Sequence, residues 1–168
     1  VIAHLKLSLL LKHENYELGR DERVQVYLTN TLDPSEITST LTGFFKELSQ
    51  ETLMANTIKR ENPILVIMGN PPYSVSSSNK SEWITNLMKD YKKDLKERNI
   101  QPLDDDYIKF IRFAQWKIEQ NREGIVGIIS NNSYVGGIIH RRMREDLIRT
   151  FNRIYILNLH GDSRKQEI

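Results

Sequence analysis

An uninterrupted apolar run that stops at two prolines constrains the fold of this chain more than any other feature. Ile64 to Gly69 contain no polar side chain, and they are followed by Asn70-Pro71-Pro72-Tyr73. A continuous apolar run of this kind predicts a strand of a parallel sheet that is covered on both faces. The prolines fix φ and lack a backbone N–H, so the strand cannot continue through them. We therefore expect an α/β fold with Asn70 to Tyr73 at the carboxyl end of a strand, where open α/β sheets bind ligands.

The four residues after this strand carry the groups that are needed to hold a planar amine. Because Pro71 and Pro72 donate no hydrogen bonds, carbonyl oxygens at the strand end are free to accept them from a ligand. The Asn70 side chain adds an acceptor, and Tyr73 adds a flat aromatic face. Acceptors beside a ring suit a planar group with an NH2, such as adenine, whose nitrogen attacks an electrophile. The alternative is a proline-rich turn without chemistry, since Asn-Pro is common in turns.

Composition narrows the class of protein without identifying a partner. The 168 residues suffice for one domain with a sizeable core. The 24 Lys and Arg against 22 Asp and Glu give a net charge of +2, so any basic surface for nucleic acid must be local. The absence of cysteine excludes disulfides, thiolate zinc sites and a cysteine nucleophile. No apolar run approaches the ~18 residues of a membrane span and none resembles a signal peptide, so we expect a cytoplasmic protein without a membrane partner.

Hydrophobic periodicity predicts helices and strands along the whole chain. Apolar residues recur at helical spacing in five segments, residues 1–12, 35–48, 83–96, 107–121 and 141–151. Strand-like patterns occupy residues 23–28, 64–68, 125–129 and 154–159. The strand at 125–129 ends in a polar loop, Ser130 to Gly137. Since the carboxyl ends of parallel strands meet at one edge of a sheet, this loop should face Asn70 to Tyr73.

Several polar segments have ordinary structural interpretations. We expect Ser74 to Ser81 to form a mobile loop, and Asp104 to Asp106 to cap the helix that follows rather than to bind a metal. The arginines of the last helix predict a solvated face or contacts with phosphate; they are Arg141, Arg142, Arg144 and Arg149. The four histidines lack the spacing of metal ligands, so we predict no metal site.

With both loops placed, the sequence resembles the amino-group DNA methyltransferases that methylate the exocyclic amine of adenine. More narrowly, it is similar to the methyltransferase domain of the large single-chain restriction-modification enzymes, the Type ISP and Eco57I-like group. The Asn-Pro-Pro-Tyr motif at Asn70 to Tyr73 is specific to amino methylation. The supporting stretches are Ala3 to Leu7, Leu9 to Leu11, Tyr27 to Leu32, Gly127 to Tyr134 and Asn158 to Lys165.

The resemblance implies roles for residues of both loops. Asn70 and the carbonyl of Pro71 would accept hydrogen bonds from the target amine and lower its positive charge as the bond to the methyl carbon forms. Pro72 belongs to the same rigid motif, and Tyr73 would stack on the adenine after the base is flipped from the duplex. The far wall of the target-base pocket is matched by two residues, Asn131 and Tyr134.

The same resemblance implies S-adenosylmethionine as the methyl donor. Asn30 matches a position that usually carries an acidic or amide group at the adenine ring of the cofactor. Tyr107 and Phe110 match aromatic positions beside the cofactor, although their spacing fits a core role equally well. The Gly-rich fingerprint of the family and its ribose-binding acidic residue do not occur in the chain. We therefore expect a partial Rossmann-like methyltransferase fold that lacks the N-terminal cofactor-binding strands.

These features imply that residues 1–168 are the C-terminal, target-base part of a catalytic domain in a larger protein. The expected partners are double-stranded DNA and the remainder of the parent polypeptide, and exposed sheet edges favour a homo-oligomer. The isolated chain should bind S-adenosylmethionine weakly or not at all, and should be inactive. Two alternatives remain open, a protein glutamine methyltransferase and a non-catalytic DNA-binding module.

Overall fold

The chain divides into two compact units. The computed structural model describes residues 2–19, 22, 24–27, 29–33 and 46–160. The first unit lies within residues 1–30 and 35–62, and the second lies within residues 31–34 and 63–168. Each unit is therefore considered by itself.

The described residues of the first unit form two helices, α1 (Ile2–His13) and α2 (Lys46–Glu61). Helix α1 confirms the helix predicted at residues 1–12, but none of its residues is buried, so its apolar residues form no core within the described part of the unit. Helix α2 is held by Lys59, whose Nζ donates hydrogen bonds to Thr29 Oγ1 at 3.1 Å and to the carbonyl oxygen of Asn30 at 3.0 Å. Most of the helix predicted at 35–48 falls outside the described residues, and the sequence analysis missed most of α2.

The strand predicted at residues 23–28 is wrong where the structure describes it. Residues 24–27 are irregular, and residues 23 and 28 lie outside the described residues. Alternating apolar residues form a strand only when their backbone groups pair with a neighbouring strand. The described part of the first unit contains no strand that could supply this pairing.

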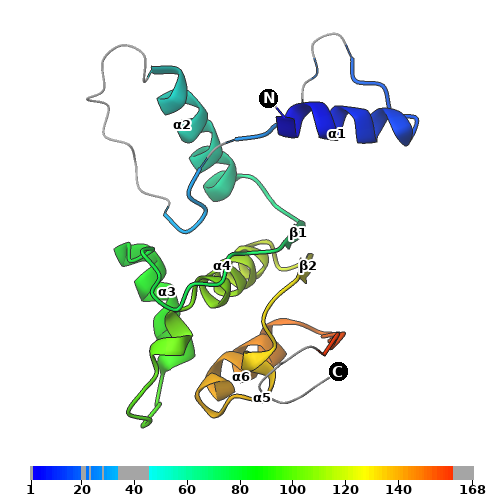
Figure 1. Cartoon of the computed structure of the whole chain (residues 1–168). Helices are drawn as coiled ribbons and strands as arrows, with labels where there is room; N and C mark the ends of the chain where they lie inside the picture. The colour runs from blue at the N-terminus through cyan, green and yellow to red at the C-terminus, as the bar shows by residue number, and fades with distance from the viewer. Residues whose placement is uncertain (1, 20–21, 23, 28, 34–45, 161–168) are drawn as a thin grey trace. The chain divides into compact units, whose positions relative to one another are not determined.

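Three helices of the second unit pack on one another beside a two-stranded parallel sheet (Figure 1). The helices are α3 (Glu82–Lys92), α4 (Asp106–Asn121) and α6 (Arg141–Thr150), and the strands are β1 (Val66–Gly69) and β2 (Ile125–Ile128). Three short elements, η1 (Gln101–Asp104), α5 (Ser133–Gly136) and η2 (Ile138–His140), connect them. The core is formed by Leu32, Ile84, Met88, Tyr91, Tyr107, Ile108, Ile111, Phe113 and Met143. The predicted helices at 83–96, 107–121 and 141–151 are thus confirmed, the first with an earlier end.

The sheet has the predicted parallel pairing. Val66 lies opposite Ile125 and Gly69 lies opposite Ile128, so both strands end at the same edge. Gly124 makes the close approach at the other edge possible, because its φ is +151° and a Cβ at this position would lie only 2.6 Å from the carbonyl oxygen of Leu65. Both features exclude a larger residue. The α/β class and the parallel sheet are therefore confirmed.

One face of this sheet is left uncovered by the described elements of the second unit. The register places the side chains of Val66, Met68 and Ile125 on the same face, and they are 55%, 80% and 67% exposed. On the opposite face Ile128 packs against the core. The prediction of a strand covered on both faces is thus wrong for one face, because the described helices of this unit pack on the other one.

The strand predicted at residues 154–159 is also wrong, since these residues are irregular. Tyr155, Leu157 and Leu159 are among the most exposed apolar residues of the described chain. In the second unit the described sheet contains only β1 and β2, so this apolar segment has no strand to pair with. Ile148 of α6 is likewise exposed, whereas Met143 on the same helix is fully buried.

Candidate functional site

The Asn70 to Tyr73 segment begins where the sheet ends. The backbone N–H of Ile129 donates to the carbonyl oxygen of Gly69 at 3.0 Å, and this is the last bond of the ladder between the strands. The carbonyls of Asn70 and Pro71 therefore lie beyond the paired region. Pro71 is buried, whereas Asn70 and Tyr73 are exposed. The Tyr73 hydroxyl donates to Asn70 Oδ1 at 3.3 Å, so an amine that binds Asn70 must compete with this hydroxyl.

Three tyrosine rings connect the two polar loops. The Tyr73 and Tyr107 ring centroids are 5.7 Å apart at 62°, and those of Tyr107 and Tyr134 are 6.4 Å apart at 51°. The rings come from the segment after β1, from the first turn of α4 and from α5. Burial, and next the Asp105 carboxylate, raise the pKa of Tyr107, so its hydroxyl stays neutral at physiological pH. The prediction that the two loops face each other is confirmed by this row of rings.

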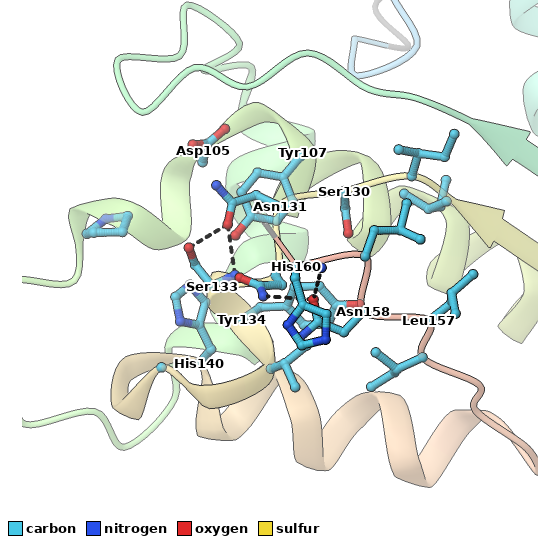
Figure 2. A pocket seen from close by; sticks show the side chains of 18 of the residues that line it. Asp105, Tyr107, Ser130, Asn131, Ser133, Tyr134, His140, Leu157, Asn158 and His160 are labelled. Carbon is cyan, nitrogen blue, oxygen red and sulfur yellow. Dashed lines mark hydrogen bonds between the residues drawn. The ribbon is translucent and has the colours of Figure 1, made fainter. Parts of the chain in front are cut away.

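A cavity of about 1250 Å³ lies beside Tyr107 and Tyr134 (Figure 2). Its walls are formed mainly by the residues that follow β2 and by residues 155–160. Asn131 and Tyr134 line it, and their role in a target-base pocket stays a prediction. Asn70 to Tyr73 do not line it, and Val75 is the residue that the segment after β1 contributes. The site therefore consists of a cavity and an exposed Asn-Pro-Pro-Tyr segment that are joined through Tyr107.

Hydrogen bonds fix the polar groups of the cavity wall. Asn131 Oδ1 accepts bonds from the backbone N–H of Ser133 at 2.8 Å and from Ser133 Oγ at 2.5 Å (Figure 2). Because its oxygen is used in this way, Asn131 can offer a ligand its amide nitrogen. Asn158 Oδ1 accepts from Asn132 Nδ2 at 3.4 Å and from the backbone N–H of His160 at 3.0 Å, which ties residues 158–160 to the same loop.

Arg144 holds the loop that carries Tyr134. Its Nη1 donates to the carbonyl oxygens of Tyr134 at 2.8 Å and of Gly137 at 2.7 Å. The prediction of a fully solvated charge is therefore wrong for Arg144, whereas contact with phosphate stays a prediction. The three other arginines of this helix are paired with carboxylates, Arg141 with Glu97, Arg142 with Asp94 and Glu145, and Arg149 with Asp146. Sequence reasoning missed the contacts of Arg141 with Glu97, of Arg142 with Asp94 and of Arg144 with Tyr134 because these partners lie outside α6.

The acidic run Asp104 to Asp106 does not cap α4 through its side chains. Asp105 and Asp106 instead accept hydrogen bonds from the segment that follows Tyr73. That segment was expected to be mobile, yet Ser77 within it is buried and bonded. Both predictions are wrong for the same reason. The carboxylates of Asp105 and Asp106 accept hydrogen bonds from residues 74–79 rather than from N–H groups of their own helix.

Comparison with known proteins assigns the chain to a family. The model of the Eco57I restriction-modification methylase family matches residues 2–164. The chain belongs to this family.

Solved structures agree with this assignment. The methylase chain is similar to a nuclease-deletion mutant of the Type ISP restriction-modification enzyme LlaGI in complex with a DNA substrate mimic, with 28% identity, a TM-score of 0.74 and 97% of the chain covered. A structure of DrdV with DNA, at 24% identity, covers 89% of the chain with a TM-score of 0.66 and supports the fold alone. The chain spans 14% and 15% of these two proteins. No curated protein matches it.

The three residues predicted to contact the cofactor, Asn30, Tyr107 and Phe110, have different surroundings. In the methylase chain, Tyr107 lines the cavity, whereas Phe110 packs half-buried against the core and does not line it. Asn30 is an exposed residue of the first unit whose carbonyl oxygen accepts a bond from Lys59. Among the described residues no cluster of three potential metal ligands occurs, and no described helix is long and apolar enough to cross a membrane.

Proposed function

We propose that this chain is the target-base part of a DNA methyltransferase that transfers a methyl group from S-adenosylmethionine to the exocyclic amine of adenine in duplex DNA. The observation that supports this most directly is the row of Tyr73, Tyr107 and Tyr134 beside the Asn-Pro-Pro-Tyr segment. Of these rings Tyr73 is exposed, and an exposed aromatic face next to hydrogen-bond acceptors suits a base that has left the stack of the duplex. Membership in a restriction-modification methylase family agrees with this substrate.

In this proposal Asn70 Oδ1 and the carbonyl of Pro71 accept the two N–H groups of the target amine. The conjugated amine is a weak nucleophile, and acceptors that stabilise its developing positive charge lower the barrier to attack. Tyr73 stacks on the flipped base and thereby offsets part of the unstacking cost of a few kcal/mol. Because the Tyr73 hydroxyl donates to Asn70 in this structure, the arriving amine takes over that acceptor.

The cofactor has one candidate contact in the described second unit. Tyr107 presents a buried ring at the wall of the cavity, which fits an aromatic neighbour of a bound cofactor. S-adenosylmethionine supplies an electrophilic methyl carbon when it is bound. The contribution of this chain is to hold the amine and the base.

We further propose that the chain works within a larger polypeptide and on double-stranded DNA. The relatives of known structure are several times longer, and those structures include a DNA substrate mimic or bound DNA. We also propose that the fold is a partial Rossmann-like methyltransferase fold without its cofactor-binding strands. In this proposal the target-base part comprises residues 1–168.

Methyl transfer from tritiated S-adenosylmethionine to unmethylated, PCR-amplified DNA tests the proposal in the complete protein. The labelled product should be 6-methyladenine by mass spectrometry, and Asn70→Ala should lower kcat by about 10²-fold or more, as expected for loss of a charge-stabilising contact. Asn86→Ala, an exposed asparagine on α3, serves as the control. Label that enters a protein extract and not DNA would support a glutamine methyltransferase instead. Full activity of the Asn70→Ala variant would contradict the assigned role of the motif.

A further inference from the structure

Two consecutive carboxylates at the start of α4 hold the segment that follows Tyr73. The backbone N–H of Ser74 donates to Asp105 Oδ1 at 2.8 Å, and the backbone N–H of Asp106 donates to the carbonyl oxygen of Ser74 at 3.3 Å. Asp106 Oδ1 also accepts from Ser77 Oγ at 2.6 Å and from Asn79 Nδ2 at 2.9 Å. The residue directly after Tyr73 is thus bonded through both of its backbone groups.

The Ser77 hydroxyl is the centre of this contact. It donates to Asp106 and accepts from Lys109 Nζ at 2.8 Å and from the backbone N–H of Asn79 at 3.1 Å. A hydroxyl has one donor and two acceptor positions, so all of them are used. Asp106 is 7% exposed and Lys109 is 3% exposed, so two opposite charges meet at one buried hydroxyl.

Burying Asp106 and Lys109 around the Ser77 hydroxyl costs desolvation free energy, but the resulting hydrogen-bonded group is rigid. Removing charged groups from water is offset only when geometry is good and the remaining hydrogen bonds are made, as they are around Ser77. Loss of one member leaves a buried group without its partner, which displaces the segment rather than merely weakening it. The arrangement therefore fixes where the chain lies immediately after Tyr73.

The residue that follows the two carboxylates is Tyr107, whose ring lies 5.7 Å from that of Tyr73. One turn of α4 therefore both carries one ring of the site and anchors the segment that carries the other. We propose that Asp105, Asp106 and Lys109 are positioning residues for methyl transfer, which set Tyr73 and the neighbouring acceptors against Tyr107. This inference rests on the proposed function.

The expected loss of rate follows from how strongly group-transfer reactions depend on the positions of the orienting groups. A displacement of about 1 Å in a group that orients the reactants can cost about 10²-fold in rate. The anchored segment adjoins Tyr73 directly, so its release should affect kcat far more than the binding of DNA, which depends mainly on phosphate contacts elsewhere.

The test compares Asp106→Ala, Asp106→Asn and Asp104→Ala in the complete protein. Asp104 belongs to the same acidic run but pairs with Lys92 at 2.6 Å and bonds to no residue of the 74–79 segment, so its variant is the matched control. Asp106→Asn keeps an oxygen that can accept from Ser77 and Asn79, and should restore part of the activity. Ser77→Ala removes the hydroxyl alone and replaces Asp106→Ala if that variant does not fold.

Two measurements are made on each variant. In Asp106→Ala, amide hydrogen exchange of residues 74–79 without DNA or cofactor should become about tenfold faster or more. The kcat for methyl transfer to unmethylated DNA should fall about 10²-fold while KM for DNA changes only a few-fold. Asp104→Ala should match the unchanged protein in both.

Unchanged exchange in Asp106→Ala, or an unchanged kcat in an active protein, would overturn this inference alone. A fall in kcat that Asp104→Ala reproduces would also overturn it. An unchanged protein that methylates no DNA would contradict the proposed function and this inference together.

Discussion

Individual polar side chains behind the surface hold both halves of the candidate site. Asp106 and Lys109 meet at Ser77 behind the Asn-Pro-Pro-Tyr segment, and Arg144 bonds to the carbonyls of Tyr134 and Gly137 in the opposite loop. In each case the charged group lies behind the residue that would touch the base. A few exposed groups are therefore enough to contact a ligand. Their positions are fixed by side chains that the ligand does not touch.

His140 is the residue whose titration should affect the stability of the cavity wall. It is buried, and both ring nitrogens lack a hydrogen-bond partner within the described structure. Burial lowers the pKa of His140, and the Arg144 guanidinium lowers it further. An unfolded chain binds the proton at about pH 6.5, whereas the folded protein binds it only at a lower pH. Stability should therefore fall as the pH drops below about 6.5, because the unfolded state binds more protons.

Urea denaturation at several pH values between about 5 and 8 measures this effect. His140→Asn should flatten the dependence of the midpoint on pH, since the residue that titrates differently in the two states is gone. Equal slopes in the unchanged protein and in the His140→Asn variant would contradict this account.

At the level of residues, the sequence marks candidate ligand-facing groups but not the groups behind them. Asn70, Tyr73 and Tyr134 are predicted as site residues because a motif and its position after a strand mark them. Asp106 and Arg144 were interpreted as a cap and as a solvated or phosphate-binding charge, because a sequence pattern shows which residues share a helix but not which element they meet. Their partners are 29 and 10 residues away, respectively.

At the level of elements, the turn from α5 into η2 requires glycine at position 137, because there is no room for a side chain there. A Cβ on Gly137 would lie 2.4 Å from His140 Nδ1 and 2.7 Å from the carbonyl oxygen of Ser133, whereas a Cβ on Gly136 would meet nothing within 4 Å. Gly137→Ala should therefore destabilise the protein by about 1–3 kcal/mol through overpacking. Gly136→Ala should change stability by no more than about 0.5 kcal/mol.

Thermal and urea unfolding of the two variants check this pair. Gly137→Ala should also disturb the loop that carries Tyr134, because the Gly137 carbonyl is one of the two acceptors that bind Arg144. Equal stability of the two variants would show that the turn accommodates a methyl group by a small shift. In that case the close contacts at Gly137 would not determine the path of the loop.

The elements that were predicted correctly are those whose own pattern is sufficient. Helix α4 and the pair of β1 and β2 follow from periodicity and continuous apolar runs. Residues 24–27 and 154–159 have strand-like patterns but are irregular, because a strand also needs a neighbour with free backbone groups. Most of helix α2 was missed since its mixed polar sequence has no clear apolar stripe.

At the level of the whole molecule, the uncovered face of the sheet predicts self-association of the 168-residue chain. Val66, Met68 and Ile125 expose contiguous apolar surface on paired strands, and both strands have open edges because the described sheet of this unit contains only these two. Such surfaces are rare on soluble monomers and favour contact with a second copy. Sedimentation velocity over a range of concentrations should show a species larger than the monomer at the higher concentrations.

Substitutions can assign that association to the sheet. Met68→Glu places a charge in the centre of the apolar face and should weaken the association, because burying an unpaired carboxylate costs several kcal/mol. Ile148→Thr removes an equally exposed apolar side chain from α6 and should leave the association unchanged. A chain that stays monomeric at all concentrations, or one whose association responds equally to both substitutions, would contradict an adhesive sheet face. Under either result the open sheet would have to be stabilised by contacts within one chain.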